Sequence, residues 1–296
     1  MSDYILSCCS TVDMQQEQLR ERNISHICFH YALNGQEMPD DLGQTLPFPV
    51  FYQAMREGAD TATSMPSMGE YMDYFTPFLQ AGKDVLHVSL SSGLSGAYNG
   101  AVLAAETLRR QFPERKLLVV DSLGASSGYG LLMDRLAELR DEGMDIDALH
   151  AWAEENKLRL NHWFFSTDLS FYVRGGRISR ASGFFGGLMG ICPLLNMDGA
   201  GHLIPREKIR SKARVMQAMV DRMEAYADDG TDYSGKCLIS HSDCYEDARA
   251  VADMVEARFP KLRGRVRIHY VGTTIGSHTG PGTVALFFWG RDRGEA

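Results

Sequence analysis

Short apolar runs alternate with helix-like patterns through the first half of the chain. Buried strands are predicted at residues 4–8, 85–90 and 116–120, where apolar residues cluster in short stretches. Apolar residues at helical spacing predict helices at 97–110, 129–140 and 146–158. Alternation of strands and helices is typical of a parallel sheet with helices on its faces.

The pattern changes after about residue 160. The strands expected beyond that point lie at 163–166, 191–197, 203–205, 236–241, 266–271 and 283–289. Long helical patterns lie among them at 211–227 and 245–259. We therefore expect an α/β protein with two lobes: an N-terminal α/β domain with a parallel sheet at 1–160 and a C-terminal mixed α+β domain at 161–296. The polar stretch 34–50 is expected to be an excursion from the first domain.

Composition and charge narrow the function classes. The chain has 296 residues, of which 44% are hydrophobic, enough for a large core. Its formal charge of 30 − 38 = −8 argues against nucleic acid as a partner. The longest apolar run, 284–289, is far shorter than the ~20 residues of a membrane-spanning helix. The first residues lack the pattern of a secretory leader, so a cytoplasmic protein is expected.

Cofactor and metal motifs are weak or incomplete. His26, Cys28 and His30 would share one face of a strand, but a half-polar strand explains them better than zinc. Residues 230–237 approach a phosphate-binding P-loop, yet Cys237 replaces the magnesium-binding hydroxyl and the motif precedes a strand. We expect no metal and no cofactor.

Four polar or glycine-rich segments carry the candidate chemistry. Residues 63–67 read Thr-Ser-Met-Pro-Ser, 89–96 form a Ser/Gly run, 174–179 contain Gly-Gly-Arg, and 276–282 contain His-Thr-Gly-Pro-Gly. Taken singly, the first is typical of a helix N-cap. The second is typical of a loop, and the last two are typical of turns, the final one between strands.

Together the four segments favour an anion site. The Ser/Gly run follows a predicted parallel strand and precedes a helix, which is where open α/β sheets bind ligands and where free N–H groups favour negative charge. Thr63, Ser92 and Ser95 offer hydroxyl donors. Arg177 and His278 add charge or further donors. This set suits a carboxylate or a phosphate head group.

The same segments carry a family resemblance over nearly the whole chain. Residues 63–67 match Thr-Ser-x-Pro-Ser, 91–98 match Ser-Ser-x-Leu-Ser-Gly-x-Tyr, and 278–282 match His-Thr-Gly-Pro-Gly. Further matches are Asp-Ser at 121–122, Gly-Gly-Arg-Ile at 175–178, Pro-Leu-Leu…Asp-Gly at 193–199 and Arg210 in a Lys-x-Arg segment. In this order, they resemble the DegV family of bacterial fatty-acid-binding proteins.

The resemblance implies a two-lobed fold with a fatty acid in a tunnel between the lobes. It implies that Thr63 and Ser95 hydrogen-bond the carboxylate, with His278 close by. The residues it places near the head group or on a partner surface are Ser92, Gly96, Arg177 and Arg210. The implied tunnel should have an apolar wall, for which the candidates are Phe184, Phe185, Leu188, Met189 and Ile191. Apolar residues at such spacing are also typical of a simple core.

The resemblance also implies a role in phospholipid metabolism. Some family members are the lipid-binding subunit of fatty acid kinase and present the acyl carboxylate to a separate ATP-dependent kinase, which makes an acyl phosphate. The chain is therefore expected to be a carrier rather than an enzyme, with a long-chain fatty acid as its ligand. Such a role is compatible with transient contact with a membrane surface.

Two departures and two alternatives accompany this reading. Cys9 stands where the family usually has an acid, and Met65 stands where Gln is common. One alternative is a serine esterase with Ser95 as nucleophile, His278 as base and Asp243 as a conceivable acid. The other is a binder of a different small anion, for which the apolar tunnel would be short or missing.

Overall fold

The computed structural model describes residues 4–179 and 191–295, and its first lobe is built on a parallel sheet. The strands are β1 (Tyr4–Cys9), β2 (Ile24–Ile27), β6 (Asp84–Ser89) and β7 (Leu117–Asp121), in the spatial order β2-β1-β6-β7. Every neighbouring pair in this sheet is parallel, as the sequence predicts. The strands are apolar and buried because helices cover both faces.

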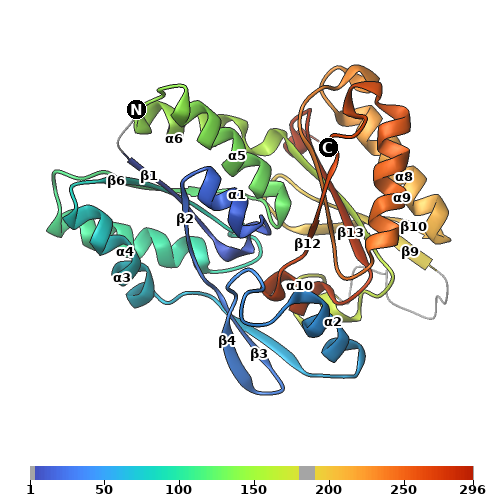
Figure 1. Cartoon of the computed structure of the whole chain (residues 1–296), viewed down its shortest axis with the longest axis horizontal. Coiled ribbons are helices and arrows are strands. Elements are labelled where there is room, and N and C mark those ends of the chain that lie inside the picture. Colours follow the sequence, from blue (N-terminus) through green and yellow to red (C-terminus); the bar gives the residue numbers. More distant parts are fainter. Residues whose placement is uncertain (1–3, 180–190, 296) are drawn as a thin grey trace.

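Helices α3 (Met68–Gln80) and α4 (Ala97–Gln111) cover one face of this sheet, while α5 (Ser127–Asp141) and α6 (Ile146–Asn156) cover the other (Figure 1). The short α1 (Gln16–Glu21) packs beside β2. The segment 63–67 ends in the predicted N-cap. The Ser67 hydroxyl accepts the Glu70 N–H, and the Glu70 carboxylate accepts the Ser67 N–H, which together form a capping box.

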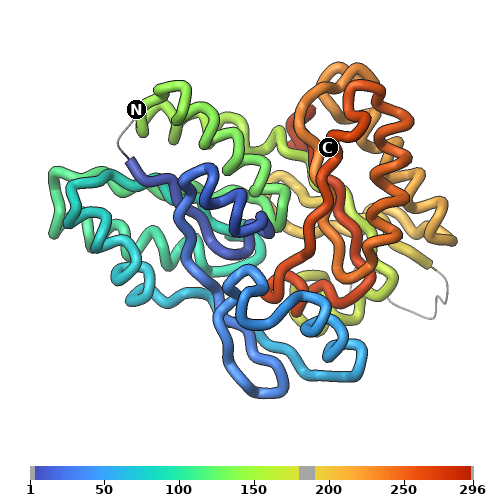
Figure 2. Tube along the Cα trace, in the orientation of Figure 1, coloured from blue at the N-terminus to red at the C-terminus, as the bar shows by residue number. Residues whose placement is uncertain are grey.

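A small third sheet projects from the first lobe. It has the order β4-β3-β5, with β3 (His30–Leu33), β4 (Gln36–Pro39) and β5 (Thr61–Ser64), and it carries α2 (Phe48–Arg56). The trace in Figure 2 shows this unit lying next to α10 (Thr273–Thr279), which packs against β3, β5 and α2. The elements of this unit run from His30 to Ser64, around the stretch 34–50 that was expected to be an excursion.

The second lobe contains a six-stranded mixed sheet in the order β10-β9-β8-β13-β11-β12. Its strands are β8 (Leu160–Ser166), β9 (Ile191–Met197), β10 (Leu203–Arg210), β11 (Cys237–His241), β12 (Arg267–Tyr270) and β13 (Thr283–Trp289). β11 and β12 are parallel, and the other pairs are antiparallel. The edge strand β10 runs well beyond the predicted 203–205, with a register shift after Pro205.

Two helices pack on the outer face of the second sheet, and α5 packs on its inner face. The outer pair is α8 (Lys212–Tyr226) and α9 (Tyr245–Arg258), while the short α7 (Ser170–Arg174) follows β8 and contacts α10. α5 contacts β8, β11 and β13 as well as α6. One hydrophobic core therefore runs between the lobes, joining Leu6 and Tyr129 to Phe164 and Phe287.

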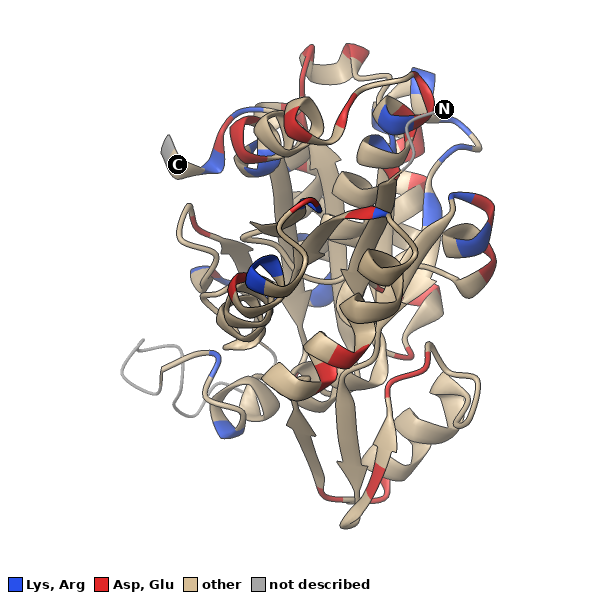
Figure 3. Cartoon of the chain, turned by 90° about the vertical axis from the view of Figure 1, so that its left-hand side faces the viewer, with Lys and Arg blue, Asp and Glu red and all other residues tan. Residues whose placement is uncertain are grey.

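Charged side chains of both signs are spread over the two lobes. Basic and acidic segments alternate over the helices in Figure 3, whereas residues 30–64 carry Glu37, Asp40, Asp41, Glu57 and Asp60 against Arg56 alone. Within 4–179 and 191–295, no cluster of three or more His, Cys, Asp or Glu side chains is arranged for a metal. His26, Cys28 and His30 do not share one strand, since β2 ends at Ile27 and β3 begins at His30.

Among the described helices, none combines the length and the apolar character needed to cross a bilayer.

Candidate functional site

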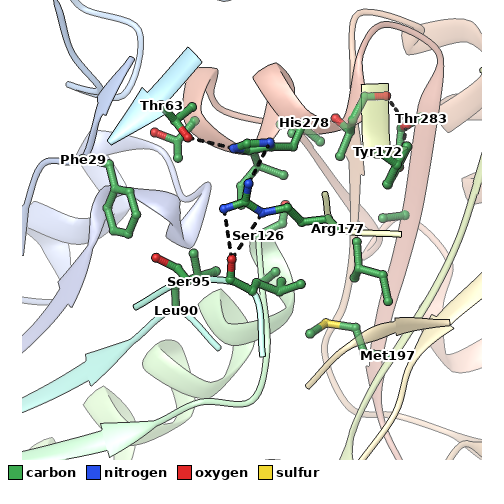
Figure 4. A pocket seen from close by; sticks show the side chains of 18 of the residues that line it. Phe29, Thr63, Leu90, Ser95, Ser126, Tyr172, Arg177, Met197, His278 and Thr283 are labelled. Atoms are coloured by element: carbon green, nitrogen blue, oxygen red, sulfur yellow. Dashed lines mark hydrogen bonds between the residues drawn. The ribbon is translucent and has the colours of Figure 1, made fainter. Parts of the chain in front are cut away.

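A cavity of about 550 Å³ lies between the loop that follows β6 and the inner face of the second sheet (Figure 4). Its wall is largely apolar; the apolar residues that line it include Phe29, Leu90, Leu94, Phe164, Met197, Leu203, Val271, Ile275, Ala285 and Phe287. Thr63, Ser95, Arg177 and His278 also line it and lie together in Figure 4. The volume is within the usual range of small-molecule sites.

The loop that carries Ser95 is fastened to the second lobe. The Ser91 hydroxyl donates to the carbonyl of Gly201 at 2.9 Å. A methyl group on Gly93 would lie 2.8 Å from that same carbonyl oxygen, so this close approach requires glycine. The Ser95 Oγ accepts the Ala97 N–H at 3.2 Å. Its hydroxyl donates to Met65 Sδ at 3.9 Å, a weak acceptor that a ligand carboxylate could replace.

Thr63, His278 and Arg177 form a chain of hydrogen bonds with a defined direction. Arg177 Nη1 donates to His278 Nδ1 at 3.4 Å, since a guanidinium has no acceptor. Nδ1 is then unprotonated, so Nε2 carries the proton and donates to Thr63 Oγ1 at 2.7 Å. The Thr63 hydroxyl is left with its own proton to donate to a ligand.

The electrostatics of this group favour a negatively charged ligand. Burial, helped by the Arg177 charge, lowers the pKa of His278 to about 4, so the imidazole is neutral at pH 7. Arg177 also donates to the Leu94 carbonyl, from Nε at 3.2 Å and Nη2 at 3.1 Å. Arg177 pairs with no acidic side chain among the described residues, so its charge acts on the cavity unneutralised.

Two buried carboxyls hold the helix that positions His278. Asp13 Oδ1 accepts the Gly272 N–H at 3.0 Å, and Asp40 Oδ2 accepts the Thr274 N–H at 3.3 Å. Burial raises the pKa of both carboxyls. The predicted turn at 276–282 is therefore wrong for its first half, because α10 continues to Thr279 and only then does the chain turn at Gly280.

The remaining predicted residues fall in different places. Gly96 lines the cavity, whereas Ser92 is exposed and donates its N–H to Asp121 at 3.1 Å. Arg210 is exposed at the end of β10, and Ile191 begins β9; neither belongs to the described cavity wall. The other tunnel candidates, at positions outside the described residues, are Phe184, Phe185, Leu188 and Met189.

Cys9, one of the two expected departures from the family pattern, lies outside the described cavity wall. Its Sγ is 3.5 Å from the Tyr71 hydroxyl and 3.6 Å from His87 Nε2, under α3. Burial raises the pKa of the thiol. This departure therefore changes a buried polar contact of the first lobe and leaves the Thr63 and Ser95 donors in place.

Among the described residues, His278 is not arranged as the base of a hydrolytic triad. A triad needs a carboxylate on one nitrogen of the histidine and the nucleophile on the other. In this chain Arg177 and Thr63 occupy those two positions on His278. Asp243, the conceivable acid, forms an ion pair with Arg56 instead.

Sequence reasoning missed much of the apolar wall. Phe164, Ala285 and Phe287 face the cavity from β8 and β13, and the Tyr172 hydroxyl is 2.9 Å from Thr283 Oγ1 at the same wall (Figure 4). Alternate residues of a strand share a face, so the positions 283, 285 and 287 carried a usable signal. The sequence did not indicate which face of that buried strand would line the cavity.

The fold and the cavity define a class of two-lobed α/β binding proteins whose apolar cavity carries polar donors. The family model described as "Uncharacterised protein, DegV family" matches residues 9–291. The chain therefore belongs to the DegV family. A DegV domain-containing protein of Clostridium perfringens is 31% identical over 290 residues, which cover 98% of each chain.

Solved structures of the same family are similar throughout. A fatty-acid-binding DegV family protein from Thermus thermophilus has a TM-score of 0.86 and 26% identity, covering 98% of this chain and 100% of that one. A DegV lipid-binding protein from Thermotoga maritima has a TM-score of 0.84 and 25% identity, covering 99% and 100%. The fatty acid kinase B3 protein of Streptococcus pneumoniae, loaded with linoleic acid, shares the fold at 19% identity with a TM-score of 0.83, covering 98% and 100%.

Proposed function

We propose that this chain binds one long-chain fatty acid, with the acyl tail in the cavity and the carboxylate on Thr63 and Ser95. The observation that carries the proposal is the chain of hydrogen bonds from Arg177 through His278 to Thr63, beside a largely apolar cavity. It leaves a hydroxyl donor and an unneutralised positive charge where a carboxylate would sit. The DegV proteins described as binding fatty acids support it.

The two ends of the ligand would contribute differently. Each buried methylene is worth about 0.8 kcal/mol, so a long tail supplies most of the affinity. A hydrogen bond to a charged group is worth about 1.5–3 kcal/mol, which is enough to fix the orientation of the carboxylate. We therefore expect Ser95→Ala to weaken carboxylate fixation more than it weakens total binding.

The experiment compares a fatty acid with the methyl ester of the same acid on delipidated protein. The native chain should prefer the acid, and Ser95→Ala should lose most of that preference while still binding both ligands. Ser92→Ala is the matched control, because Ser92 is a neighbouring exposed serine outside the described cavity wall. Equal affinity of the native chain for acid and ester would contradict the proposed carboxylate site.

We further propose that the bound carboxylate is presented to a separate ATP-dependent fatty acid kinase. Ser64, Met65, Ser67 and Gly96 line the cavity and are exposed, so the carboxylate end would open to solvent and to a partner. The P-loop-like residues pass through a 3₁₀ turn into β11 and open no helix, so they lack the geometry that holds phosphates. ATP would bind the partner.

Reconstitution tests the partnership. The loaded chain, ATP and a kinase catalytic subunit from the same genome should together yield an acyl phosphate and ADP, with the acyl phosphate trapped by hydroxylamine. Omitting any one component should abolish the product. Acyl phosphate made by the chain with ATP alone, or no product from the complete mixture, would overturn this part of the proposal.

A further inference from the structure

His162 on β8 lies in the cavity wall formed by the second sheet. Alternate residues of the paired strands β8 and β13 face the cavity, and Phe287 is directly opposite His162 in the register. Phe287 lies four residues beyond Thr283, which contacts α10, so the two positions are about 13 Å apart along the strand. His162 and Phe287 therefore lie along the strand away from α10, the helix that carries His278.

The His162 ring is held in one orientation. Its Nδ1 proton donates to the Leu160 carbonyl at 3.1 Å, because a carbonyl oxygen can only accept. The ring also meets Phe287 edge to face, with centroids 5.3 Å apart and planes at 83°. This fixes both the tilt of the imidazole and the direction of Nε2.

The backbone of Gly124 and Gly128 packs directly against the side of the His162 ring that carries Nε2. A methyl group on Gly128 would lie 2.1 Å from His162 Nε2, and one on Gly124 would lie 3.1 Å away. The imidazole is thus pressed against the backbone at the start of α5, a contact that only glycine allows. Nε2 has no hydrogen-bond partner among the described residues, so no polar bond holds the ring on this side.

We infer that His162, backed by Gly124 and Gly128, is the fixed floor that limits how long an acyl chain the cavity accepts. This inference rests on the proposed fatty-acid function and names the residue that sets chain length. A tail that reached the ring could be extended only by moving the imidazole into the backbone of α5. Chains longer than the limit must therefore leave methylenes outside the cavity, where they gain nothing from burial.

The test replaces His162 by smaller side chains. His162→Ala removes the ring, while His162→Asn shortens the side chain and keeps an amide that can donate to the Leu160 carbonyl. Each purified, delipidated variant is incubated with an equimolar series of even-numbered saturated fatty acids, and the bound acids are extracted and weighed by mass spectrometry. Both variants should shift the preferred length upward by at least two carbons, since each further buried methylene favours the longer acid by roughly fourfold.

His87→Ala is the matched control, because it deletes an equally buried imidazole that lies under α3, outside the described cavity wall. It should keep the native length preference. A native chain that takes up no fatty acid refutes the proposed function itself. A native chain that loads normally, with unchanged length preference in a folded His162→Asn or His162→Ala variant, refutes the floor.

Discussion

Thr63 shows how the direction of one hydrogen bond decides what a site can bind. Arg177 donates to His278 Nδ1, so the ring proton is on Nε2. The Thr63 hydroxyl therefore accepts from Nε2. A protonated imidazole would donate from both nitrogens and lose the contact from Arg177. The low pKa of His278, about 4, keeps the directed arrangement intact through neutral pH.

Thr63→Val removes the donor at almost constant volume. We expect fatty acid affinity to fall by about tenfold or more, the worth of one hydrogen bond to a charged group, with methyl ester affinity unchanged. Titration calorimetry on delipidated protein measures both. Thr107→Val, on α4 and outside the described cavity wall, is the control and should bind as the native chain does, since the Thr107 hydroxyl bonds only to the Leu103 carbonyl of its own helix.

His87 makes stability depend on pH. Burial lowers its pKa to about 3 from 6.5, so between those values the unfolded chain takes up a proton that the folded chain refuses. The free energy of unfolding must therefore fall as the pH drops below about 6.5. His87→Gln should reduce the loss of stability between pH 7 and pH 5 by up to about 2 kcal/mol, measured by urea unfolding.

The surface substitution Asn99→Gln on α4 serves as the control for that measurement. Neither side chain titrates, so it should leave the pH dependence of unfolding as it is in the native chain. If His87→Gln shows the native slope as well, the buried imidazole at position 87 is not a source of the pH dependence.

Helix α10 was not predicted from the sequence. Its residues are Thr, Gly, Ser, Ile and His, most of them weak helix formers, so local propensity indicated a turn. Asp13 and Asp40, more than two hundred residues away in the chain, accept its first N–H groups. Tertiary hydrogen bonds of this kind leave no trace in a local pattern, and they place His278 beside Thr63.

The turn after α7 supports the same histidine from the other side. A methyl group on Gly175 would lie 2.3 Å from His278 Nδ1, although its backbone conformation suits any residue. Gly175→Ala should therefore displace the imidazole and lower fatty acid affinity at least tenfold while the chain stays folded. Calorimetric titration tests the affinity, and thermal unfolding tests the fold.

Gly176→Asn is the companion variant. Gly176 has φ +74 and open space around it, a conformation that Asn tolerates. It should bind fatty acid as the native chain does. Weak binding by both variants would mean that the turn matters through its flexibility and not through contact with His278.

At the scale of the whole molecule, long apolar strands and periodic helices were predictable and polar strands were not. The parallel sheet follows from buried apolar runs such as β6 and β7. The third sheet was predicted only as a polar excursion, because β4 and β5 are half-exposed and carry few apolar residues. Their pairing depends on β3, which no local signal reveals.

The site was predictable only in part for the same reason. Thr63, Ser95, Arg177 and His278 come from four segments spread over the chain. Their residue types favoured a shared anion site, and the resemblance to a family assigned them to one ligand, but neither gave their geometry. To predict the cavity wall, one would need to know which face of β13 meets the cavity. To predict the floor at His162, one would need to know that Gly128 approaches the ring closely. Such contacts are properties of the assembled lobes.

Mass spectrometry of the purified recombinant protein tests the central claim most directly, first in native form and then after denaturation with organic extraction. The account predicts one long-chain fatty acid per chain, retained in the native spectrum and released on denaturation. An empty protein that also takes up no added fatty acid would contradict it.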